Sequence, residues 1–160
     1  MDAAAVSTEV TVEVAETVGP ELVAAWARLA PQLAVAVPGA PEEVAEATLK
    51  EIVTSDATTM LLAKVDGVIV GTVTIAVFPL ASGRRAWIED LVVDEDARGR
   101  NVAEVLVVAA IRHAAARGAH DIDLASRMSR TEAQVLNRRA GFELRPTAVY
   151  RLTPSARNAG

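Results

Sequence analysis

The chain has 160 residues, of which 51% are hydrophobic, so it is long enough to form one domain with a continuous core. The absence of cysteine excludes disulfides, thiolate metal sites and a cysteine nucleophile, and a net charge of -5 without a basic tail argues against nucleic acid as a partner. No signal peptide opens the chain and no apolar run approaches the roughly 18 residues that a membrane span needs, so a cytoplasmic protein without a membrane partner is expected.

The apolar residues recur at strand and helix spacing in an order that predicts one mixed α/β domain. Two β-rich runs meet at Asp66-Gly67, a dipeptide that favours a tight hairpin. Ser129 and Glu132 have the spacing of a capping box, with Ser129 as the N-cap. In chain order we expect disorder at 1–8, a strand at 9–15, helices at 20–31 and from 42, strands at 58–65, 68–78 and 84–93, a helix at 102–118, a strand at 120–125, a helix at 129–141 and a strand at 147–152.

The stretch between the strand at 84–93 and the helix at 102–118 predicts an anion site. An acidic turn ends the strand, and Arg98, Gly99, Arg100 and Asn101 then lead into the helix that begins at Val102. Unpaired N–H groups, the helix dipole and the arginines would together stabilise phosphate oxygens at such a helix start. The strand at 120–125 returns after this helix, so we expect it to pair in parallel with the strand at 84–93.

Two segments resemble motifs of the GNAT acyltransferases. The first is RGRNVA at 98–103, which resembles the loop that binds the pyrophosphate of acyl-CoA; Asn101 stands where the family normally has its second glycine. The second is SRTEAQVLNRRAGFE at 129–143, which resembles the later motif Asn-x-x-Ala-x-x-x-Tyr-x-x-x-Gly-Phe. Here Arg130 replaces the asparagine and Asn137 replaces the tyrosine, whereas Ala133, Gly141 and Phe142 match.

The resemblance implies a single GNAT-like α/β (α+β) domain at 9–154, followed by a tail at 155–160. Its sheet would be mixed, mostly antiparallel and six- to seven-stranded, flanked by about four helices. The implied activity is N-acyl transfer, in which the amine of a small molecule attacks acetyl-CoA or another acyl-CoA directly. The pantetheine arm would lie in a gap between the strands at 84–93 and 120–125. The implied acyl-CoA-binding residues are Leu91, Val92, Val93, Arg98, Gly99, Arg100, Asn101, Val102 and Ala103.

Three residues are candidates for catalysis. Glu89 and Asp90 interrupt an otherwise apolar strand, and either could act as the base with a pKa raised by burial. The alternative is that one of them faces solvent while the other pairs with an arginine such as Arg85. The family tyrosine lies near the thioester sulfur and is often assigned as the acid, so Asn137 is the third candidate, although an amide has no proton to give at neutral pH.

Several alternatives stay open at this stage. The chain could be a GNAT-fold protein repurposed away from acetyl transfer, either as a ligand-binding module or as an enzyme of different chemistry in the same cleft. Asn101 could either accept the left-handed conformation of the missing glycine or cap the helix itself, with Glu104 completing a box. The isolated histidines, His113 and His120, predict no metal site. A homodimer is an open alternative to a single copy, and the arginine-rich composition indicates a GC-rich, bacterial genome.

Overall fold

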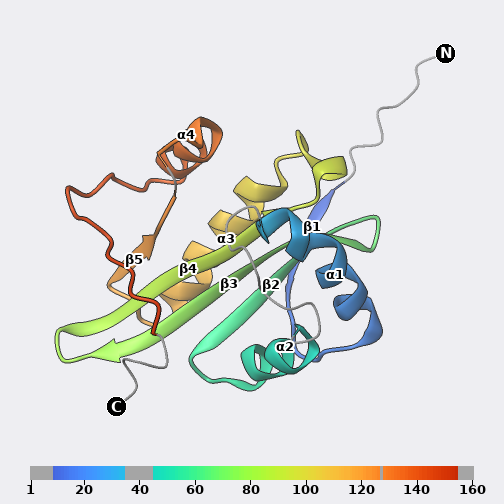
Figure 1. Cartoon of the computed structure of the whole chain (residues 1–160), viewed down its shortest axis with the longest axis horizontal. Helices are drawn as coiled ribbons and strands as arrows, with labels where there is room; N and C mark the ends of the chain where they lie inside the picture. The colour runs from blue at the N-terminus through green and yellow to red at the C-terminus, as the bar shows by residue number, and fades with distance from the viewer. Residues whose placement is uncertain (1–8, 35–44, 127, 155–160) are drawn as a thin grey trace.

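The computed structural model describes residues 9–34, 45–126 and 128–154 (Figure 1). The expectations for 1–8, for the loop and helix start at 38–44 and for the tail at 155–160 lie outside these residues. No helix in the described part of the chain is both long and apolar enough to cross a membrane. The elements are β1 (Val10–Val14), α1 (Pro20–Ala34), α2 (Ala45–Thr54), β2 (Thr58–Val65), β3 (Val68–Leu80), β4 (Gly83–Val93), the 3-10 turn η2 (Glu95–Ala97), α3 (Val102–Ala116), β5 (Asp121–Leu124) and α4 (Thr131–Arg139).

The sheet has the order β1-β2-β3-β4-β5. Its first four strands are antiparallel, and β4 and β5 are parallel, as predicted from the helix that connects them. The hairpin between β2 and β3 is also confirmed. Asp66 and Gly67 have φ values of 51° and 78°, and two consecutive left-handed residues are what a tight turn between twisted strands requires.

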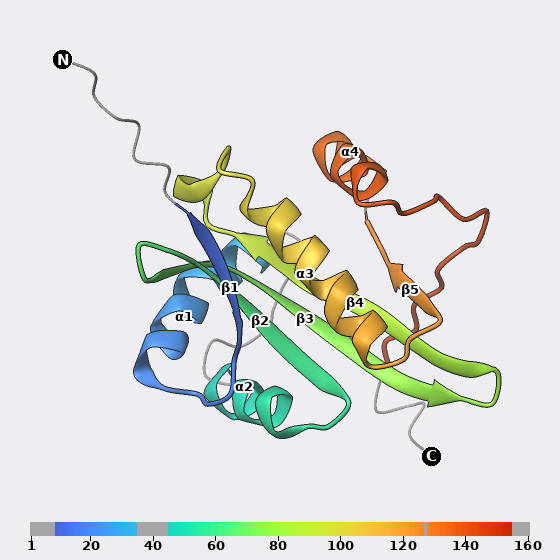
Figure 2. The same cartoon turned by 180° about the vertical axis from the view of Figure 1, so that it is seen from behind.

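Helices cover both faces of the sheet (Figures 1 and 2). On one face α3 packs through Leu106 and Ala110 against alternate residues of β2, β3 and β4. On the other face α1 packs through Leu22 and Leu29, together with Leu49 of α2. Each cluster takes every second residue of a strand, which is the period expected of a sheet buried on both sides.

Gly71 on β3 sets the distance between the sheet and α3. A Cβ atom at this position would lie 3.1 Å from a methyl group of Leu106 and 3.2 Å from a methyl group of Val102. It would also meet the backbone oxygen of Val92 at 3.0 Å. The start of α3 therefore lies close to the sheet because glycine leaves room for it.

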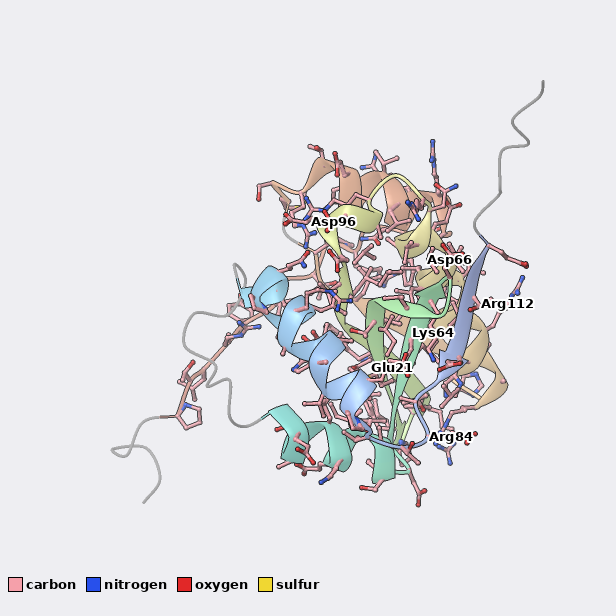
Figure 3. All side chains as sticks on the ribbon, turned by 90° about the vertical axis from the view of Figure 1, so that its right-hand side faces the viewer. Glu21, Lys64, Asp66, Arg84, Asp96 and Arg112 are labelled. Atoms are coloured by element: carbon pink, nitrogen blue, oxygen red, sulfur yellow. The ribbon has the colours of Figure 1, made fainter. Side chains whose placement is uncertain are left out.

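Lys64 links the edge strand β1 to the helix α1 through two ion pairs (Figure 3). Its ammonium group on β2 lies 2.7 Å from Glu13 on β1 and 3.5 Å from Glu21 on α1. Both carboxylates are largely exposed, so these pairs orient the elements more than they stabilise the fold.

Two predictions of secondary structure are wrong. Within the described residues the sheet has five strands and not six or seven, because residues 147–152 form no strand and expose Val149, Tyr150 and Leu152. Their alternating pattern suits a strand, but a strand also needs a partner edge, and the adjacent β5 has four residues. The predicted capping box is wrong as well. The N-cap of α4 is Arg130, not Ser129, and its side chain makes no cap hydrogen bond. Ser129 lies in a turn before the helix, where its carbonyl accepts a hydrogen bond from the N–H of Thr131.

Candidate active site

The strand β4 continues past the end of β5. Their parallel register joins Arg85 to Asp121 and ends with Ile88 opposite Leu124, whereas β4 runs on to Val93 (Figure 1). Along this later part β4 has β3 on one side and, in the part of the chain that is described, no strand on the other. The backbone N–H and C=O groups on that open edge are free to pair with an extended ligand.

A β-bulge interrupts β4 at the same place. Val92 lies opposite Thr72 of β3 and Glu89 lies opposite Thr74, so Asp90 and Leu91 together face the one residue between the threonines. Asp90 has φ of 51°, a left-handed conformation that is uncommon for residues other than glycine.

The bulge exchanges the two faces of β4. Before it, Ala86 and Ile88 pack in the cluster beneath α3, and after it Val92 packs in the opposite cluster beneath α1. Without the extra residue Val92 would fall on the same face as Ile88. Bulges of this kind are common next to active sites, where they redirect side chains and interrupt pairing.

The two candidate carboxylates lie at the bulge in different surroundings. Glu89 is exposed, and its Oε1 accepts a hydrogen bond from Nε1 of Trp87. Burial of the carboxyl group raises the pKa of Asp90 above its ordinary value, although the residue as a whole is exposed. Neither carboxylate forms an ion pair with Arg85, whose guanidinium lies 3.5 Å from Asp123 on β5.

The arginine-glycine loop places unpaired N–H groups at the start of α3. Gly99 and Asn101 adopt left-handed conformations with φ of 82° and 59°. Asn101 is the N-cap, but its side chain makes no cap hydrogen bond. Of the two alternatives, the capping box with Glu104 is therefore wrong, and Asn101 instead takes the left-handed conformation of the missing glycine. Arg98 and Arg100 are exposed beside this helix start, which is the arrangement that suits a phosphate group.

Residues 23–142 match the acetyltransferase (GNAT) family. The chain belongs to this family. The match includes the bulged strand, the arginine-glycine loop at 98–103 and all but the last residue of the segment at 129–143.

Solved structures show that the GNAT fold extends over nearly the whole chain. An aminoglycoside N-acetyltransferase, AAC(6')-Iy, in complex with CoA has a TM-score of 0.75 at 21% identity, with 92% of this chain and 96% of that chain covered. A glucosamine-6-phosphate N-acetyltransferase from Arabidopsis thaliana has a TM-score of 0.70 at 18% identity, covering 90% and 99%. A transcriptional regulator from Bacillus halodurans C-125 has a TM-score of 0.75 at 24% identity, covering 91% and 100%. No curated protein matches the chain.

A contact that the sequence did not reveal fixes the segment just before the arginine-glycine loop. On α1, Nε of Arg28 donates to Oδ2 of Asp94 at 2.7 Å, and Nη2 of Arg28 donates to the carbonyl of Ile69 at 2.5 Å. The neighbouring Gln32 accepts a hydrogen bond from the N–H of Glu95 at 3.0 Å. The Arg28 guanidinium holds the pKa of Asp94 below its ordinary value despite burial. No sequence motif signals this contact, because 66 residues separate its partners.

The third catalytic candidate, Asn137, lies on α4. The helix has no buried residue, and Asn137 itself is half-buried. Its carbonyl accepts a hydrogen bond from the N–H of Phe142 at 2.9 Å. Among the described residues, no hydrogen bond or ion pair joins its side chain to Glu89 or Asp90.

His113 packs between α3 and β2. His113 on α3 is half-buried, and its Nε2 lies 3.0 Å from Oγ1 of Thr59. Burial, with a smaller effect of Arg117, lowers the pKa of His113. It lines an open hollow between β1 and α3 that also includes Val14 and lies away from the bulge. In the described ranges no three metal-ligating side chains gather into a group that could hold a metal ion.

Proposed function

We propose that the chain is an N-acyltransferase that transfers the acetyl group of acetyl-CoA to an amine of a small molecule. The observation that carries the proposal is that β4 passes the end of β5 at a bulge and then leads directly into the loop at the start of α3. A ligand with an amide-containing arm and a pyrophosphate can occupy an open strand edge and a helix start at once.

The binding residues divide into two groups along the chain. The backbone of Leu91, Val92 and Val93 offers N–H and C=O groups to the amides of the pantetheine arm. The loop offers charge and free N–H groups to the pyrophosphate. These loop residues are Arg98, Gly99, Arg100, Asn101, Val102 and Ala103.

The reaction needs one base and no covalent enzyme intermediate. The amine nitrogen forms a bond to the thioester carbonyl carbon, the C–S bond breaks, and CoA leaves as a thiolate that takes a proton from water. The proton lost by the amine goes to a carboxylate at the bulge. Glu89 suits this role because it is exposed on the face opposite α3, and Asp90 is the second candidate because its raised pKa makes it a stronger base than an ordinary aspartate.

A second candidate function is a GNAT-fold protein that performs other chemistry in the same cleft. The observation that favours it is Asn137, whose amide supplies no acid for a departing thiolate. In this alternative, Asn137 forms hydrogen bonds to a different ligand.

Two measurements distinguish the functions. Calorimetric titration with acetyl-CoA and CoA should give micromolar affinity if the chain is an acyltransferase, and absence of binding at millimolar ligand would reject that function. Thiol release from acetyl-CoA should then depend on an added amine, tested with a panel of amines of differing size and charge. Binding without thiol release would favour the second function.

A further inference from the structure

Two threonine hydroxyl groups on β3 are buried without a partner. Thr72 is 0% exposed and Thr74 is 9% exposed. Neither Oγ1 atom has a hydrogen-bond partner in the part of the chain that the structure describes. Buried polar groups in native proteins are nearly always paired, so each of these hydroxyls needs an explanation.

The two threonines differ in what lies opposite them on β4. Thr72 faces Val92, which has no polar side-chain atom, whereas Thr74 faces Glu89. Side chains directly opposite each other on antiparallel strands have Cβ atoms about 4.5 to 5.5 Å apart. A rotation of the Glu89 side chain therefore brings its carboxylate within hydrogen-bond distance of the Thr74 hydroxyl.

The Glu89 carboxylate has the capacity for this second bond. It accepts one hydrogen bond, from the indole of Trp87, which lies two residues earlier on the same face of β4. A carboxylate has two oxygens and about four acceptor sites, so it can accept from Trp87, Thr74 and a substrate amine together. Glu89 is exposed on this face of the sheet, so an amine can approach it from that side.

None of the neighbouring charged groups donates a hydrogen bond to Glu89 in the described structure, so the Thr74 hydroxyl is the donor available to it on β3. Asp90 follows it on β4 and is an acceptor when ionised. Arg85, on the same face, pairs with Asp123 of β5 at 3.5 Å. From α1, Arg28 is held by Asp94 at 2.7 Å.

We propose that Thr74 is a positioning residue for the reaction: its hydroxyl donates to the Glu89 carboxylate and holds it against the attacking amine. Thr74 keeps its proton throughout, and the proton lost by the amine goes to Glu89. The indole N–H of Trp87 and the hydroxyl of Thr74 then both donate hydrogen bonds to the Glu89 carboxylate. This inference rests on the proposed function, with Glu89 as the base.

The matched pair Thr74→Val and Thr72→Val tests the inference, because each removes one buried hydroxyl from the same strand at nearly constant volume. Thr74→Val should lower kcat for amine-dependent thiol release about tenfold to a hundredfold, the effect of losing a hydrogen bond to a charged group, with KM for acetyl-CoA unchanged. Thr72→Val should leave both constants unchanged. Thr74→Ser, which keeps the hydroxyl, should retain most of the wild-type kcat.

A double-mutant cycle with Glu89→Gln gives the decisive readout. If Thr74 acts through the carboxylate, adding Thr74→Val to Glu89→Gln should not lower the residual rate further. Additive losses, wild-type kcat in Thr74→Val, or equal losses in both valine variants would each overturn the inference. In those cases the wild type still transfers acetyl groups, so the proposed function stands. A wild type that neither binds acetyl-CoA nor releases thiol overturns both.

Discussion

The contact between Arg28 and Asp94 makes a measurable prediction about stability. The carboxylate of Asp94 is 10% exposed and the guanidinium of Arg28 is 44% exposed, with 2.7 Å between Nε and Oδ2. Arg28→Ala removes this bond and the bond to the carbonyl of Ile69, and leaves a nearly buried carboxylate with weaker partners such as the N–H of Asp96 at 3.3 Å.

The expected loss lies between those of a surface pair and a buried pair. Exposed ion pairs contribute about 0.2 to 1 kcal/mol, and breaking a fully buried pair costs about 3 to 5 kcal/mol. With one partner buried and the other half-exposed, we expect the free energy of unfolding of Arg28→Ala to fall by about 2 to 3 kcal/mol. Urea unfolding at pH 7 measures this difference.

Lys50→Ala provides the matched control. Lys50 forms an ion pair of 2.6 Å with Glu46, slightly shorter than that of Arg28, but both partners are more than half exposed. Its removal should cost at most about 0.5 kcal/mol. If Arg28→Ala costs no more than Lys50→Ala, then burial of Asp94 is not what makes the contact stabilising, and the reasoning is refuted.

The pH dependence of the same variant has a definite sign. Because Arg28 lowers the pKa of Asp94 in the folded chain, the pair stabilises the fold above the unfolded-state pKa of about 3.9. That contribution is lost as the pH falls through the lower, folded-state pKa. The stability difference between the wild type and Arg28→Ala should therefore be full at neutral pH and shrink below about pH 4.

Three further predictions concern the proposed active site. Arg98→Ala should weaken CoA binding in calorimetry by about 1.5 to 3 kcal/mol through loss of a charge-assisted phosphate contact; unchanged affinity would reject the loop as the phosphate site. Asn101→Gly should leave CoA affinity within about twofold, since Asn101 already has the left-handed backbone and caps nothing, and a large gain would show that its side chain obstructs the site. Asn137→Tyr should accelerate thiol release, within the roughly 10² to 10⁴ that general acid catalysis supplies, if acetyl transfer is the native reaction. A tyrosine variant without any gain would favour the repurposed fold.

Local chemistry made the order of elements predictable from the sequence. Asp66-Gly67 defines its turn without help from the rest of the chain, because both residues tolerate the left-handed conformation. The start of α3 after Asn101 was equally readable, since its apolar residues follow helical spacing. The same spacing could not decide whether Asn101 would cap the helix, because a side-chain rotamer depends on surroundings that the sequence does not list.

Features that depend on distant partners were not predictable. The bulge at Asp90 is defined by what lies opposite on β3, and the apolar run of β4 reads the same with or without it. The pairing of Arg28 with Asp94 joins residues 66 positions apart in the chain. Residues 147–152 show the converse case, where a strand-like pattern forms no strand.

The bulge also determines which peptide groups of β4 remain for a ligand. A strand presents its peptide groups alternately to the two sides, so the pairing of Val92 with Thr72 commits some N–H and C=O groups to β3 and leaves the others on the open edge. Deleting one residue at Asp90 or Leu91 would preserve a β-strand but exchange the committed and the free groups. The number of residues between Glu89 and Val92 therefore matters as much as their identity, because a change of one residue would alter which N–H and C=O groups a ligand meets on the open edge.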